Sequence, residues 1–186
     1  MTPPPAVHDE PVAVVALADA ASDETAYDHF AQITVRGGYS RYYSFGFLTA
    51  GGELSLEVVD ELQVVVGAEV YSVRRKLPPE VALRTGIYAE WAQVLPINIG
   101  AVYDIPLGRV QPYVGADIIF AKIYETSFAA GGRLRGGLDV MIVPNFGVNA
   151  NLALGAWSGK RWPELEPGIG ATGVLPQVSL GTLVAF

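Results

Sequence analysis

Residues 146–157 read FGVNANLALGAW, and this stretch decides the fold. Its even-numbered positions carry Phe, Val, Ala, Leu, Leu and Ala, whereas its odd-numbered positions carry Gly, Asn, Asn, Ala, Gly and Trp. Successive side chains of a β-strand point to opposite faces, so this alternation predicts a strand with one apolar face and one face of mostly polar or small residues.

The same alternation recurs from about residue 31 to the end of the chain. It predicts eight strands, at residues 31–40, 50–59, 62–71, 90–103, 110–121, 132–142, 146–157 and 174–186. The connectors at 60–61, 105–109 and 144–145 are short, whereas those at 44–48, 74–88, 124–131 and 158–173 are longer. An even number of strands with alternating short and long connections predicts an all-β, antiparallel up-and-down barrel with a short-turn end and a long-loop end.

Composition limits the classes of protein that this chain can represent. Its 186 residues suggest one folded domain, and 51% are hydrophobic while only 17% are charged, against about 25% in ordinary soluble domains. Window 140–159 is uncharged, but its proline, three asparagines and three glycines make a poor membrane-spanning helix. The chain has no cysteine, which excludes disulfides and thiolate metal sites, and its net charge of −7 disfavours a nucleic-acid partner.

The charge is concentrated at the start of the chain. Residues 1–29 contain six acidic and no basic residues, whereas the rest contains 13 acidic and 12 basic residues. His8, Asp9 and Glu10 stand where a signal peptide needs basic residues, so a signal peptide is excluded here. We expect a Pro-rich acidic linker at 1–29, with a short helix or strand near 12–21, followed by a barrel domain at 30–186.

The residue types on the two faces indicate which one lies inside the barrel. A water-exposed face should be rich in Lys and Glu, but the polar face here carries Gly, Ser, Asn and Gln with few charges of both signs. The apolar face has no charge in the strand cores, as hydrocarbon requires. The pattern therefore favours a transmembrane barrel with its apolar face outside. A soluble ligand-binding barrel with the apolar face inside is the alternative.

The charges on the polar face are expected to pair inside the narrow lumen. Ions in a desolvated interior are costly unless paired, and an eight-stranded barrel has room for side chains rather than a wide channel. We predict a plug of ion pairs, with a narrow channel for small solutes or ions as the alternative. The predicted members are Arg36, Glu53, Glu57, Glu69, Asp117, Arg133, Arg135 and Asp139.

Aromatic residues gather near both ends of the predicted strands, as in the girdles that flank a membrane. The long-loop group comprises Tyr39, Tyr42, Tyr43, Tyr71, Trp91, Tyr124, Trp157 and Trp162. The short-turn group comprises Tyr103, Phe146 and Phe186.

Two motifs add a resemblance to a known family. Residues 107–116 read LGRVQPYVGA, a turn into a strand with a Pro-Tyr-Val-Gly pattern, and residues 178–186 form an alternating last strand that ends in Phe186. Together with the eight strands, they make residues 30–186 resemble the small eight-stranded outer-membrane barrels, namely the OmpA-type transmembrane domain and its OmpX- and OmpW-like relatives. The resemblance implies a Gram-negative outer membrane, with short turns and both termini in the periplasm. It also implies that Phe186 is read by the barrel-assembly machinery.

No residues form a convincing catalytic site. Both histidines, His8 and His29, precede the barrel, so a His-based acyl-transfer site would lack its base. We interpret Glu164 and Glu166 as solvated loop residues. We expect no enzyme activity, metal or cofactor, and a structural or anchoring role in which residues 1–29 could tether a periplasmic partner protein.

Basic residues gather near the long-loop end. We expect them to contact lipid and lipopolysaccharide phosphates in the outer leaflet, although ordinary solvated loop charges would give the same pattern. The candidates are Arg41, Arg74, Arg75, Lys76, Lys160 and Arg161.

Overall fold

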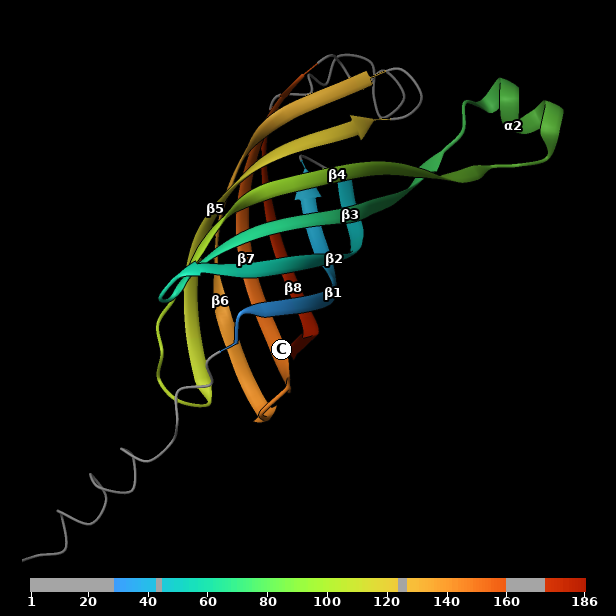
Figure 1. Ribbon diagram of the computed structural model, residues 1–186. Helices are drawn as coiled ribbons and strands as arrows, with labels where there is room; N and C mark the ends of the chain where they lie inside the picture. Colours follow the sequence, from blue (N-terminus) through green and yellow to red (C-terminus); the bar gives the residue numbers. More distant parts are fainter. Residues whose placement is uncertain (1–28, 43–44, 124–126, 160–172) are drawn as a thin grey trace, which may run out of the picture.

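The chain folds into a closed antiparallel barrel of eight strands, as the alternation predicts (Figure 1). The computed structural model describes residues 29–42, 45–123, 127–159 and 173–186. Linker 1–29 falls outside this description except for its last residue. The elements are β1 (Ala31–Tyr42), β2 (Phe45–Val59), β3 (Leu62–Lys76), α2 (Pro79–Thr85), β4 (Ala89–Asp104), β5 (Val110–Ile123), β6 (Ser127–Val143), β7 (Phe146–Gly159) and β8 (Gly173–Ala185).

Pairing of the first and last strands closes the barrel. Each strand pairs with its neighbours in sequence, and β1 pairs with β8 from Gln32 opposite Ala185 to Ser40 opposite Gln177. The N–H of Phe186 donates to the carbonyl oxygen of Ala31 at 2.9 Å. Closure leaves no free sheet edge, and it places the start of β1 and the end of β8 together at the short-turn end.

The strands are longer at the long-loop end than the sequence pattern predicts. Tyr42 pairs with Phe45, so the connector expected at 44–48 shrinks to residues 43–44. The connector expected at 124–131 shrinks to 124–126 because Ser127 already pairs with Ile123. The strands continue beyond the region in which apolar and polar side chains alternate regularly. Because the prediction used only that alternation, it ended these strands too early.

The connection expected at 74–88 is mostly ordered structure. The β3–β4 arm, defined as residues 74–91, extends the two strands beyond the barrel wall and ends in the short helix α2 (Figure 1). A proline in its first turn and Gly86, at φ 72°, account for where α2 begins and ends. Within the described part of the chain, no helix is both long and apolar enough to cross a membrane.

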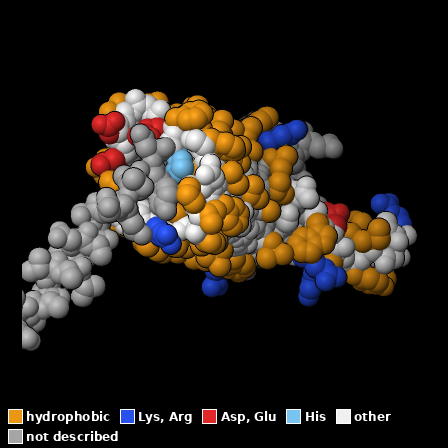
Figure 2. Space-filling view, turned by 60° about the horizontal axis from the view of Figure 1, so that its bottom comes forward, with side chains coloured by type: hydrophobic (Ala, Val, Ile, Leu, Met, Phe, Trp, Pro, Cys, Tyr) orange, Lys and Arg blue, Asp and Glu red, His pale blue; other side chains and the backbone are white. Residues whose placement is uncertain are grey.

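The apolar face of every strand lies outside. Leu134, Leu152 and Leu180 expose 64–68% of their surface in the middle of β6, β7 and β8, although the polar or small residues that flank them are buried or partly buried. Figure 2 shows apolar side chains over much of the visible wall. A soluble ligand-binding barrel would have the opposite arrangement, so the outward apolar face matches a transmembrane barrel.

Two aromatic residues assigned to the girdles point into the lumen instead. Tyr71 and Trp157 are almost fully buried, and their ring centroids lie 5.7 Å apart. Both residues share the strand parity of the polar face, so the girdle prediction was wrong for them. Tyr39 and Trp91 are exposed near the long-loop end, and Tyr103, Phe146 and Phe186 are exposed near the short-turn end. Tyr43, Tyr124, Trp162 and the side chain of Tyr42 lie outside the described residues.

The outward apolar face predicts a depth-dependent cost for charge. Leu134→Arg, at the middle of β6, should lower the free energy of unfolding in lipid vesicles by about 2–4 kcal/mol. Ile105→Arg, in the connector at the short-turn end, should cost only about 0–1 kcal/mol because the arginine can reach water. Both free-energy costs can be measured by urea titration, with the folded fraction read from the different gel mobilities of unheated and boiled samples. Equal costs at the two sites would contradict a lipid-facing wall.

Candidate functional site in the barrel lumen

The long-loop end of the lumen is filled by an apolar layer. Its residues come from seven strands and are all buried. They are Phe47, Tyr71, Val73, Val94, Ile119, Ala121, Ala129, Trp157 and Leu175. They lie close to the strand ends at the long connectors, on the same face as the polar lumen residues. This part of the interior therefore packs like the core of a soluble protein.

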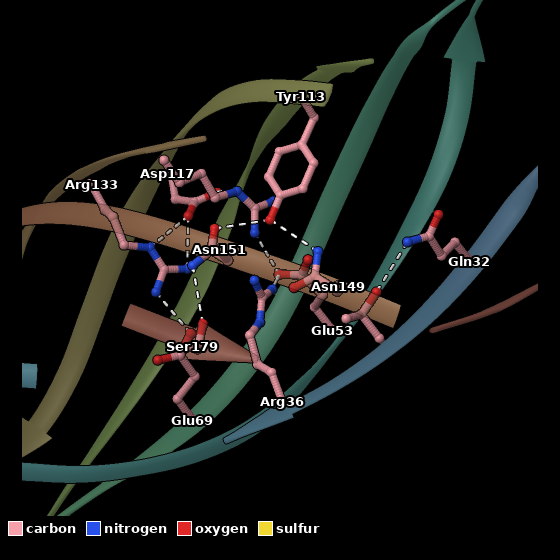
Figure 3. Close-up of polar contacts among 12 residues, drawn as sticks. Gln32, Arg36, Glu53, Glu69, Tyr113, Asp117, Arg133, Asn149, Asn151 and Ser179 are labelled. Carbon is pink, nitrogen blue, oxygen red and sulfur yellow. Dashed lines mark hydrogen bonds and ion pairs between the residues drawn. The ribbon is translucent and has the colours of Figure 1, made fainter. Parts of the chain in front are cut away.

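Charged residues form a continuous chain across the middle of the lumen (Figure 3). We call it the ion-pair chain, and its order is Glu69, Arg133, Asp117, Arg135, Glu53, Arg36. Acidic and basic residues alternate along it, so three carboxylates balance three guanidinium groups. The six residues come from β1, β2, β3, β5 and β6, and the chain therefore links strands on opposite sides of the lumen.

Arg133 is the most connected member of the chain. Its Nη1 lies 2.8 Å from Glu69 Oε1, and its Nε donates to Asp117 Oδ2 at 2.8 Å. The side chain of Arg133 is 4% exposed, that of Glu69 5% and that of Asp117 0%. Such pairs are favourable only because both ions are desolvated together and hydrogen-bonded.

Asp117 and Glu53 each bridge two arginines. Asp117 Oδ1 lies 3.5 Å from Arg135 Nε, and Arg135 Nη1 lies 2.6 Å from Glu53 Oε2. The same oxygen of Glu53 also pairs with Arg36 Nη2. Each bridging carboxylate thus holds two positive charges in place.

Gln177 joins the ion-pair chain to the apolar layer. Its Nε2 donates to Glu69 Oε2 at 3.0 Å, while its Oε1 accepts a hydrogen bond of 2.8 Å from the hydroxyl of Tyr71. Arg133 Nη1 donates to the same Gln177 oxygen at 3.4 Å. The amide therefore satisfies polar groups at the boundary between the two layers.

A second polar network lies closer to the short-turn end. Asp139 accepts hydrogen bonds from Asn149 Nδ2 at 2.5 Å and Gln32 Nε2 at 3.1 Å. Asn149 Nδ2 also donates to the hydroxyl of Tyr113 at 3.1 Å, and that hydroxyl donates to Asn151 Oδ1 at 3.0 Å. This network consists mainly of neutral amides and hydroxyls.

The structure brings together six of the eight residues predicted for the plug. Asp139 lies instead in the second network, and Glu57 accepts a hydrogen bond of 3.2 Å from the N–H of Glu61 near the β2–β3 turn. These two carboxylates have neighbours of another kind because they lie nearer the short-turn end than the arginines. Sequence analysis missed Gln177, Tyr113 and Asn149 as site members, although their strand parity places them inside.

The described residues around the second polar network enclose little free space and include no candidate metal site. A cavity lined by residues of the second network, including Gln32, Asp139 and Asn149, has a volume of about 10 Å³. That volume holds about one water molecule. Among the residues that the structure describes, no group of three or more His, Cys, Asp or Glu side chains could hold a metal ion.

The basic residues expected at the long-loop end are described in part. Arg41 is exposed near the end of β1, and Arg74 and Lys76 are exposed on the β3–β4 arm. The backbone of Arg75 pairs with that of Glu90. Lys160, Arg161, Glu164 and Glu166 lie outside the described residues.

Comparison with known proteins identifies the fold. Neither a protein-family model nor a curated protein sequence matches this chain. The crystal structure of Neisserial surface protein A (NspA) matches with a TM-score of 0.59 at 15% identity, over 84% of this chain and 96% of that chain. The fold is that of the small outer-membrane barrels. The N-terminal β-barrel domain of Pseudomonas aeruginosa OprF and the outer membrane protein OprG from Pseudomonas aeruginosa match as well.

The two Pseudomonas matches cover similar shares of both chains. The OprF domain gives a TM-score of 0.55 at 14% identity, over 83% of this chain and 97% of that chain. OprG gives a TM-score of 0.51 at 12% identity, over 85% of this chain and 97% of that chain. At these identities the likeness concerns architecture, so the role of this chain must be argued from its own residues.

The geometry of the ion-pair chain predicts a large cost for breaking it. Arg133→Met should lower the free energy of unfolding by about 3–5 kcal/mol, because Glu69 and Asp117 would stay buried without their main partner. Adding only Glu69→Gln to the same variant should restore much of that loss, because Asp117 and Glu53 then still balance Arg135 and Arg36. Arg84→Met, on the exposed side of α2, serves as the control and should change stability by less than about 0.5 kcal/mol. A single Arg133 variant as stable as the control would show that the pairs contribute nothing.

Proposed function

We propose that this protein is a non-enzymatic barrel of a Gram-negative outer membrane, with a sealed lumen and a structural or anchoring role. The observation that carries the proposal is the ion-pair chain, which crosses the lumen and connects to an apolar layer above it. A membrane anchor needs only the lipid-facing wall, so the interior is free to be filled for stability.

Two different barriers support the sealed state. A hydrated ion entering from the long-loop end would meet Tyr71, Trp157 and their apolar neighbours, where it would have to lose water without gaining a partner. Beyond them, it would have to displace an arginine or a carboxylate from a hydrogen-bonded pair. Each barrier alone opposes conduction. An ion would have to pass one after the other, so both barriers must be opened before the lumen conducts.

We propose that the short-turn end faces the periplasm. The ends of β1 and β8 meet there, so residues 1–29 would enter the periplasm and could tether a partner protein. Phe186 directly follows the closing strand at the same rim, where the barrel-assembly machinery would read it during insertion. The long-loop end, with its basic residues, would then face lipopolysaccharide.

A sealed lumen makes a prediction for planar bilayers. The wild-type protein should give no stable single-channel steps. Tyr71→Ser with Trp157→Ser should remain silent because the ion-pair chain is intact, and Arg133→Ser should remain silent because the apolar layer is intact. The combined triple variant should conduct, since both barriers are then opened.

The same recordings decide between the seal and a narrow channel. Wild-type steps that change in size when Arg133 or Glu57 is altered would favour the channel and overturn the seal. Gel mobility of unheated and boiled samples verifies that each variant is folded. If the folded triple variant stays silent, the two layers are not the barriers.

The position of the basic residues supports contact with lipopolysaccharide. Arg74 and Lys76 are exposed on the outward face at the long-loop end, where phosphate groups of the outer leaflet would lie. Replacing Arg74, Arg75 and Lys76 together with glutamine should reduce the lipopolysaccharide that co-purifies with the barrel. Unchanged lipopolysaccharide content would indicate ordinary solvated loop charges.

A further inference from the structure

The outward face of the β3–β4 arm continues the lipid-facing surface of the barrel. In β3, every second residue from Val64 faces outward, and the same parity reaches Arg74 and Lys76. In β4, Ile97 and Trp91 share the outward face, and Trp91 pairs directly with Arg74. A molecule lying against this face of the arm would therefore also contact the surface that lipid covers.

This face contains a groove of about 750 Å³ beside α2. Small-molecule sites have volumes of about 300–1,000 Å³, so the groove is large enough for a ligand. Leu77, Leu83 and Tyr88 provide apolar lining, and Arg74 and Lys76 provide positive charge. None of the described residues that line it is a carboxylate.

The apolar residues of the groove are unusually open to their surroundings. Leu83 exposes 80% of its surface and Tyr88 exposes 69%, and Ile87, next to Tyr88 in the sequence, exposes 54%. Exposed apolar surface of this kind, bordered by charged residues, marks a place that a partner or lipid covers. Figure 2 shows apolar and basic side chains together on the arm, at the right of the view.

We infer that this groove binds one phosphorylated acyl lipid of the outer leaflet, the lipid A part of lipopolysaccharide. Its phosphate would contact Arg74 and Lys76, and an acyl chain would lie against Leu77, Leu83 and Tyr88. Charge complementarity selects an anion, and continuity with the lipid-facing wall selects a lipid over a soluble protein. The inference rests on the proposed outer-membrane location with the long-loop end outside.

Binding of Kdo2-lipid A to the folded, detergent-solubilised full chain tests the inference by native mass spectrometry. We expect Arg74→Gln with Lys76→Gln to weaken binding about tenfold or more, through the loss of charge-assisted hydrogen bonds. Leu83→Asp should also weaken it about tenfold. Arg84→Gln removes a positive charge from the same helix outside the groove lining, and should leave binding unchanged. Dephosphorylated lipid A should bind wild type as weakly as phosphorylated lipid A binds the charge variant.

Each other outcome overturns the inference in a defined way. If Leu83→Asp binds as wild type does while the charge variant does not, the basic residues contact phosphate without the groove. If inorganic phosphate competes as well as lipid A, the site takes a free anion. If a soluble protein displaces lipid A from the arm, the groove is a protein-docking surface.

A second measurement separates this inference from the proposed location. The chain has no cysteine, so Leu83→Cys and Glu80→Cys each give a single site for a nitroxide label in lipid A-containing vesicles. The label at 83 should be more accessible to oxygen than to a water-soluble nickel reagent, and the label at 80 should show the reverse. If the barrel is heat-modifiable but both labels are more accessible to the nickel reagent than to oxygen, lipid binding in the groove is refuted. The proposed membrane barrel then still stands. A chain that never inserts would refute the proposed location itself.

Discussion

Backbone N–H and carbonyl groups inside hydrocarbon must find partners within the protein, because no water is available there. In this chain, the pairing of β1 with β8 meets that requirement by removing both sheet edges. Closure with only eight strands also fixes the width of the lumen. The narrow interior and the shared position of the two barrel ends both follow from that single pairing.

A narrow lumen determines what polar residues can do inside it. Arg133 and Arg135 have no access to bulk water, so each must be surrounded by carboxylates from other strands. Because Asp117 and Glu53 are shared between arginines, three acids are enough for three bases. The apolar layer around Tyr71 and Trp157 then fills the space that is left toward the long-loop end.

Side-chain alternation is a local property, so the sequence could predict the strands, their order and the inward face of each. Which charged side chains pair, however, depends on how distant strands are positioned relative to one another across the lumen. Arg133 and Glu69 are 64 positions apart, and alternation alone cannot bring them together. Trp157 shares its strand face with Asn149 and Asn151, so the alternation already predicted that it points inward. The grouping of aromatic residues by strand end did not take the strand face into account. The β3–β4 arm could not be foreseen, because its backbone pairing outlasts the apolar pattern.

None of the six residues in the ion-pair chain comes from β7 or β8. Gln177 is the contribution of β8 to this part of the lumen, and it is neutral. The charges can therefore neutralise one another in a curled, still open sheet of β1 to β6. During biogenesis, the last hairpin could then close the seam without carrying an unpaired ion into the bilayer, which removes an electrostatic barrier from the final step of assembly.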